Sequence, residues 1–172
     1  MHDEVREAAS GTVARFAVGL TDGISKLAVH AILAGVLDTP SLRLLCHEGE
    51  AEDLLAELAH HHLDLVLSSQ PAPHNSNLRL SSERLIASPI DWYGPAAVVR
   101  KTHVDHFPQC LASRGMGVFP LAAFGAERND PMHRGLRWLG RSPEVKEEIH
   151  AIVSRRGRHH PLTQKVLSAA HA

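Results

Sequence analysis

The chain has 172 residues, of which 44% are hydrophobic and 22% charged, a globular composition with room for one large domain or two small lobes. The net charge of -1 excludes the basic excess of a free-standing nucleic-acid binder. The apolar runs are too short to span a bilayer, and residues 1–11 (MHDEVREAASG) have no apolar core that would make a secretory signal. We therefore expect a cytoplasmic protein with no membrane partner.

Strand-like and helix-like runs alternate through the front half of the chain. Residues 12–20 are rich in β-branched and aromatic side chains and predict a strand, and apolar residues at helical spacing predict a helix over 24–37. A strand over 42–46, a helix over 51–58 and a strand over 63–67 complete a β-α-β-α-β order. Because these strands are almost wholly apolar, the order predicts a parallel sheet buried between helices.

From Pro71 onwards the sequence becomes irregular and rich in turn residues, and the predicted elements are short. They are a loop at 71–77, strands at 78–80, 85–87, 117–120, 135–139 and 148–155, an extended run at 89–93, helical turns from Pro95 and over 121–127, and a last helix that begins at Pro161.

The numbers of cysteine and histidine residues bear on whether the chain has disulfides or a metal site. The two cysteines, Cys46 and Cys110, exclude a disulfide framework and a CxxC metal motif. The fourteen histidines are densest at 60–62 and 159–160, where a metal site is one interpretation. Neighbouring histidines on a helix point in different directions, and no acidic partner stands at ligand spacing, so solvated helix ends are the favoured interpretation. We expect no metal and no cofactor.

The turns that follow the three front-half strands are the candidate binding positions, because parallel sheets place ligands at the carboxyl ends of their strands. Asp22, Gly23 and Ser25 follow the first strand, where the N–H groups of a helix start favour an anion. The alternative is that Asp22 and Ser25 only cap the helix.

Two further groups belong to this set. Glu48 and Gly49 follow the second strand in a predicted turn, where Glu48 would repel an anion and favour a cation or a hydrogen-bond donor. The alternative is an acidic residue that complements a helix N-terminus. Ser68, Ser69 and Gln70 end the third strand, where they either donate to a ligand or terminate the strand.

No catalytic constellation is present in the sequence. Ser68 and Ser69 lack the glycine elbow of hydrolases, and no GxGxxG or P-loop motif occurs. Cys46 lies in a strand predicted to be buried, which makes a poor nucleophile. His150 stands between apolar neighbours, as packed histidines do. We therefore expect a protein that is not an enzyme.

Several stretches carry a resemblance to a known family. Glu48-Gly49, Leu54-Leu55, Leu58 and the run 63–67 resemble the first half of the effector-binding domain of LysR-type transcriptional regulators. Three stretches are similar to the NhaR-like branch, the activators of sodium/proton antiporters: 61–71 (HHLDLVLSSQP), 107–111 (FPQCL) and 140–161 (GRSPEVKEEIHAIVSRRGRHHP).

The resemblance implies an α/β fold like that of type 2 periplasmic binding proteins, with two Rossmann-like lobes and an effector cleft between them. It places the end of a linker helix at 1–11, lobe I at 12–88 plus 157–172, and lobe II at 89–156. Phe119 resembles part of the second-lobe segment that borders the cleft. The family has a strand, a helix and a strand before this segment that have no counterpart here, so we expect a shortened lobe II.

The resemblance also implies a function. We expect an effector-binding regulatory domain that responds to sodium, pH or a small ligand and pairs with itself through lobe I as a dimer or tetramer. The helix over 24–37 and the edge strand from Leu42 are the expected pairing surfaces. The chain shows no helix-turn-helix, so DNA would be reached only through a domain outside it. The alternatives are a stand-alone small-molecule or ion-binding protein of the same fold and a truncated remnant without function.

Overall fold

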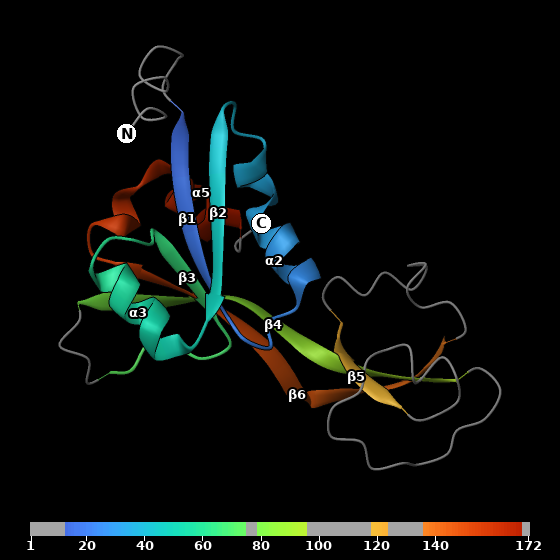
Figure 1. The fold of residues 1–172 in the computed structure, drawn as a ribbon. Coiled ribbons are helices and arrows are strands. Elements are labelled where there is room, and N and C mark those ends of the chain that lie inside the picture. Colours follow the sequence, from blue (N-terminus) through green and yellow to red (C-terminus); the bar gives the residue numbers. More distant parts are fainter. Residues whose placement is uncertain (1–12, 75–78, 96–117, 124–135, 170–172) are drawn as a thin grey trace. The chain divides into compact units, whose positions relative to one another are not determined.

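The computed structural model describes residues 13–74, 79–95, 118–123 and 136–169 (Figure 1). By its contacts the chain forms two compact units, Met1–Ile86 with Glu148–Ala172, and Ala87–Glu147. The predicted linker-helix end, the turn over 96–99 and the segment 107–116 lie outside the described residues. In chain order the elements are β1 (Ala14–Thr21), α2 (Lys26–Leu37), β2 (Leu42–Gly49), α3 (Ala51–Ala59), β3 (Leu65–Ser68), β4 (Leu80–Pro95), β5 (Phe119–Ala122), β6 (Leu136–Ser154), the 3-10 helix η2 (Gly157–His159) and α5 (Pro161–Ala169).

β1, β2 and β3 lie side by side in one parallel sheet, which confirms the prediction for the front half. β1 pairs with β2 along its whole length, with Val18 opposite Cys46, and pairs on its other side with β3, with Val18 opposite Leu65. β3 pairs in turn with the last part of β6, in the antiparallel sense, and the full hydrogen-bonding order is β2-β1-β3-β6-β4-β5. The central position of β1 explains its continuous apolar run, because a strand that is covered on both faces buries both sets of side chains.

Helices cover both faces of the parallel strands, and successive side chains of β1 enter different cores. Phe16 is fully buried in the core that β1 forms with α2 and α5, whereas Ala17 lies in the core formed with α3, together with Leu58. Full burial of a side chain of this size contributes about 1.5–3 kcal/mol. Gly19 faces the same core as Ala17, and a Cβ atom there would lie 2.9 Å from Leu63 Cδ1, so the close packing of β1 in this core depends on glycine.

β2 differs from the prediction in its length and exposure. The strand runs through to Gly49, so Glu48 and Gly49 form its last two positions and not a turn. Its side chains are half-buried or exposed because β2 lies at the edge of the sheet. Cys46 is exposed, and its predicted burial was wrong, since an apolar run has the same composition in an edge strand as in a central one. Partial shielding of the thiol, and then the charge of Glu48, raise the pKa of Cys46 above its ordinary value.

Two long strands replace the short ones predicted after residue 78. β4 runs from Leu80 through the pieces predicted at 85–87 and 89–93, and β6 runs from Leu136 to Ser154 and so joins most of the pieces predicted at 135–139 and 148–155. Each of the two strands has residues in both units. The residues between the predicted pieces stay extended because strand pairing is a non-local interaction that overrides local preference. Pro95 ends β4, so the prediction that it begins a helix was wrong.

In the second unit, β5 pairs antiparallel with β4, and Tyr93 stands opposite Phe119. These two rings are buried and stack with their centroids 5.8 Å apart. The buried carboxylate of Asp91 accepts two hydrogen bonds from the guanidinium of Arg141, at 2.7 and 2.9 Å. β5 includes residues 121 and 122, so the helical turn predicted to start there was wrong at these positions.

The last helix, α5, begins with Pro161 as predicted, because the fixed φ of proline suits the first position of a helix and its missing N–H would have no partner there. Among the described residues, no helix combines the length and the apolarity needed to cross a membrane.

Candidate functional site

The predicted binding residues of the first unit meet at one edge of its sheet. Leu20 stands opposite Glu48 of β2 and opposite Leu67 of β3, so the three parallel strands end at the same level. The turn after β1, the end of β2 and the residues after β3 are therefore neighbours at this carboxyl edge. Phe119, the remaining predicted site residue, lies in β5 of the second unit with its ring against Tyr93.

The turn after β1 is built as the start of a helix. Gly23 has a φ of +84°, in the left-handed region where a side chain would be strained. Ser25 is the N-cap of α2, and its hydroxyl oxygen accepts a hydrogen bond from the Ala28 N–H at 3.4 Å. Asp22 is exposed beside them. The capping interpretation holds for Ser25, and its hydroxyl proton is still available to donate to a ligand.

Glu48 forms an ion pair with Lys26, the first residue of α2, at 2.5 Å. Both side chains are more than half exposed, so the pair adds little stability. Its effect on the site is electrostatic, because the lysine cancels the negative charge that would repel an anion or attract a cation. The acidic residues in the first turn of α3 are Glu52 and Asp53, so these, and not Glu48, complement that helix N-terminus.

Ser68 is the last residue of β3, and it lies opposite a residue of β6 that lines a neighbouring cavity. Its hydroxyl oxygen accepts a hydrogen bond from the Gln70 N–H at 3.1 Å, which turns the chain, and Ser69 and Gln70 are exposed. Ser68 stands opposite His150 of β6 in the sheet register. Side chains that stand opposite each other on paired strands share one face, so Ser68 and His150 lie on the same side of the sheet.

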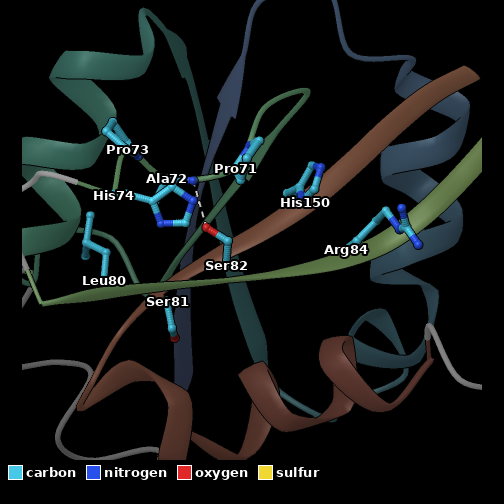
Figure 2. Close-up of a pocket in the computed structure, with 9 residues that line it drawn as sticks. All are labelled: Pro71, Ala72, Pro73, His74, Leu80, Ser81, Ser82, Arg84 and His150. Carbon is cyan, nitrogen blue, oxygen red and sulfur yellow. Dashed lines mark hydrogen bonds between the residues drawn. The ribbon is translucent and has the colours of Figure 1, made fainter.

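A cavity of about 560 Å³, which we name the Arg84 pocket, opens beside this point in the first unit (Figure 2). It lies between the loop that follows β3 and the strands β4 and β6. Ile152, two positions along β6 from His150, packs into the core formed with α3, so the pocket lies on that face of the sheet. Its lining residues are Pro71, Ala72, Pro73, His74, Leu80, Ser81, Ser82, Arg84 and His150.

A bridging carboxylate organises the charges at the Arg84 pocket. Glu148 accepts from Arg84 at 3.0 Å with one oxygen and contacts His150 Nε2 at 3.2 Å with the other. The hydrogen bond to His150, and then the one to Arg84, lower the pKa of Glu148. Ser82 Oγ accepts from the Ala72 N–H at 2.7 Å and holds the proline-flanked loop against β4, as Figure 2 shows.

This arrangement suits a small polar ligand. The guanidinium of Arg84 has N–H groups beyond the one that Glu148 uses, and the Ser82 hydroxyl has a proton to donate, so both can bind a carboxylate or a similar oxyanion. Pro71, Pro73 and Leu80 supply apolar surface for the body of such a ligand.

The sequence did not predict the Arg84 pocket. His150 was interpreted as a packed histidine, and it is buried, but it also lines this cavity. Arg84, Ser82 and His74 carried no signal beyond alternation on a strand and a loop composition.

Within the described ranges no three His, Cys, Asp or Glu side chains gather as metal ligands would. The rings of His60 and His62 lie 6.1 Å apart, and His60 Nδ1 contacts the carbonyl oxygen of Ala56.

The mixed α/β fold matches that of solved regulatory domains of LysR-type transcriptional regulators, which resemble periplasmic binding proteins. The structure matches the reduced OxyR regulatory domain of Pseudomonas aeruginosa with a TM-score of 0.69 at 13% identity, over 92% of this chain and 95% of that one. It matches reduced OxyR of N. meningitidis with a TM-score of 0.64 at 13% identity, over 91% and 93%. Full-length CbnR in complex with its target DNA matches with a TM-score of 0.69 at 14% identity, over 99% and 76%.

In sequence, the chain is 25% identical over 201 aligned residues to the transcriptional activator protein NhaR of Escherichia coli. The alignment covers 91% of this chain and 65% of NhaR. NhaR of Shigella flexneri matches with the same identity and coverage. The resemblance to LysR-type regulators of the NhaR-like branch is confirmed, and the chain spans somewhat less than two thirds of these relatives. No family model matches the sequence.

Proposed function

We propose that this chain is the effector-binding regulatory domain of a LysR-type regulator in the cytoplasm, with an effector seat in its first unit. The observation that supports this most is the meeting of three parallel strand ends at one edge, next to the Arg84 pocket. Asp22, Gly23 and Ser25 would contact the effector from the first turn, Glu48 and Gly49 from the second, and Ser68, Ser69 and Gln70 from the third. Phe119, in the second unit, is the remaining residue proposed to contact the effector.

The residues favour a small organic acid over sodium as the effector. A bare cation needs several oxygen ligands, whereas Glu48 is already paired with Lys26. Arg84 and Ser82 offer donors that suit a carboxylate. Protons would act on the same site through Glu148, whose carboxylate joins β6 to Arg84 of β4. A pH response and a ligand response would thus share one set of residues.

Self-association through the first unit is the second part of the proposal. Leu27 and Leu37 of α2 are 43% and 44% exposed, so they leave apolar surface on this helix that a second copy could cover. β2, at the edge of the sheet, has N–H and C=O groups available for another chain. Burial of these two elements against a second copy would give a dimer.

DNA would be contacted by a helix-turn-helix domain outside these 172 residues. A stand-alone binding protein of this fold is the alternative, and monomeric behaviour would favour it.

A thermal-shift screen tests the effector seat with two matched variants. Arg84→Met removes the guanidinium group of Arg84 from the pocket. The control, Arg158→Met, removes a guanidinium group that lies outside the pocket and pairs with Glu83. The two arginine side chains are similarly exposed, at 59% and 47%. We expect a small carboxylate to raise the melting temperature of the wild-type protein and of Arg158→Met but not of Arg84→Met. Absence of any shift with carboxylates, sodium or altered pH in the wild type would overturn the proposal.

A further inference from the structure

A second hollow lies in the first unit where α3 and β6 end and β4 begins. Its volume is about 370 Å³, and we name it the three-arginine hollow. Its lining residues are Ala59, His61, Arg79, Leu80, Ser154, Arg155 and Arg156. Three of these seven side chains carry a permanent positive charge, and none of the seven is acidic. The hollow is separate from the Arg84 pocket, with which it shares only Leu80.

The three arginines differ from most other basic side chains of the molecule. Lys26, Arg84, Arg141 and Arg158 each form an ion pair with a carboxylate. Within the described residues, Arg79, Arg155 and Arg156 have neither an ion pair nor a hydrogen bond through their side chains. The described residues therefore place three like charges around one hollow that no carboxylate lines, an arrangement that a bound anion would stabilise.

The backbone of Arg155 and Arg156 is held by a closed turn. The Gly157 N–H donates to Ser154 Oγ at 3.0 Å and closes the turn that contains Arg155 and Arg156. A Cβ atom on Gly157 would lie 3.0 Å from the Asp64 carbonyl oxygen, so this turn packs tightly against the chain before β3. The backbone positions of Arg155 and Arg156 are consequently set by the turn, which reduces the entropy lost when their side chains bind a ligand.

Arginines near the end of a helix can also serve only to balance its dipole, and α3 ends at this hollow. The end of α3 has other partners, however. His60 Nδ1 contacts the Ala56 carbonyl oxygen at 2.8 Å, and Arg15 donates to the His62 carbonyl oxygen at 3.4 Å. None of the three arginines of the hollow donates a hydrogen bond to this helix end within the described part of the chain.

We propose that the three-arginine hollow binds a small ligand through a multiply charged oxyanion of the phosphate type. Guanidinium groups bind such oxygens in pairs through their planar N–H forks, and three of them match a di- or trianion better than a monocarboxylate. The adjoining hollow shares His61, Ser154 and Arg156 with this one and adds His159, which extends the row of donors. The Asp64 carboxylate also lies there, and it accepts the Ala17 N–H at 2.8 Å. A concave site of this size favours a small phosphorylated molecule over a nucleic-acid strand.

Titration calorimetry of the full chain with inorganic phosphate and with pyrophosphate, at constant ionic strength, tests the proposal. The variants are Arg79→Gln, Arg155→Gln and Arg156→Gln. The control is Arg137→Gln, which removes an exposed arginine of the second unit. We expect pyrophosphate to bind more tightly than phosphate, and each variant to weaken binding about five- to tenfold. The Arg137→Gln control should bind like the wild type.

Three results would overturn the proposal. The first is the absence of saturable pyrophosphate binding below about 10 mM. The second is an equal loss of affinity in the Arg137→Gln control, which would indicate non-specific charge attraction. The third is tighter binding of a random-sequence DNA duplex than of pyrophosphate, with the DNA affinity reduced in the same three variants. That result would indicate a nucleic-acid-binding surface in place of a small-ligand site. Because the three side chains are exposed, circular dichroism melts of the unliganded variants should match the wild type.

Discussion

Replacement of Gly19 by alanine tests how closely β1 packs in the core that it forms with α3 and β3. The added Cβ would lie 2.9 Å from Leu63 Cδ1, 3.1 Å from Val66 Cγ2 and 3.2 Å from Leu54 Cδ2. These three side chains are at most 4% exposed, so they have no solvent into which to move. Since all three must shift together in a packed core, we expect Gly19→Ala to lower the free energy of unfolding by about 1–3 kcal/mol.

Gly35→Ala is the matched control for this substitution. Gly35 lies inside α2, and a Cβ atom there meets nothing within 4 Å. Alanine should stabilise the helix by about 0.5–1 kcal/mol because it loses less backbone entropy than glycine. Urea unfolding followed by far-UV circular dichroism measures both variants. A Gly19→Ala protein as stable as the wild type, beside the expected gain for Gly35→Ala, would refute the close packing around Gly19.

Four further predictions concern the first unit. Ser25→Ala removes the hydroxyl that caps α2 and should cost about 0.5–2 kcal/mol in the same unfolding assay. Cys46, in a protein with Cys110→Ser, should react with a thiol reagent without unfolding, and its rate should rise at a higher pH than that of an ordinary free thiol because its pKa is raised; complete protection in the folded state would contradict its exposure. Glu148 has a lowered pKa, so its carboxylate stabilises the folded state above the unfolded pKa and this contribution is lost as the pH falls through the folded pKa; Glu148→Gln should flatten the acid side of a stability profile measured from about pH 7 to 3. Leu27→Glu on the exposed face of α2 should shift a dimer to monomer in analytical ultracentrifugation, and an unchanged sedimentation coefficient would exclude α2 from the interface.

The front half was predictable because its elements are encoded by local periodicity. The apolar residues of β1 and β3 are consecutive, and Leu54, Leu55 and Leu58 recur at helical spacing, so order and type follow directly. Edge position is different, because it depends on which strand has no second neighbour. This is why β2 appeared from its composition to be buried, and why the exposure of Cys46 was missed.

The long strands and the pockets depend on contacts that local sequence does not encode. β4 and β6 remain extended across polar residues because each pairs with distant strands. The hydrogen bond from Arg84 to Glu148 joins residues 64 positions apart, and it places His150 at the Arg84 pocket only once the two strands are in register. The turn residues of the carboxyl edge could be predicted, since parallel strands bring their ends together, but the pairing of Glu48 with Lys26 could not.

Nuclear Overhauser contacts across β1 test the central arrangement most directly. The account places Val18 between Cys46 and Leu65 in parallel pairing, with the ends of all three strands at one edge. In a uniformly labelled protein, we predict backbone contacts of the parallel pattern from the neighbourhood of Val18 to both of these strands. Contacts of the antiparallel pattern, or contacts to only one of the two strands, would contradict the shared edge and the effector seat proposed on it.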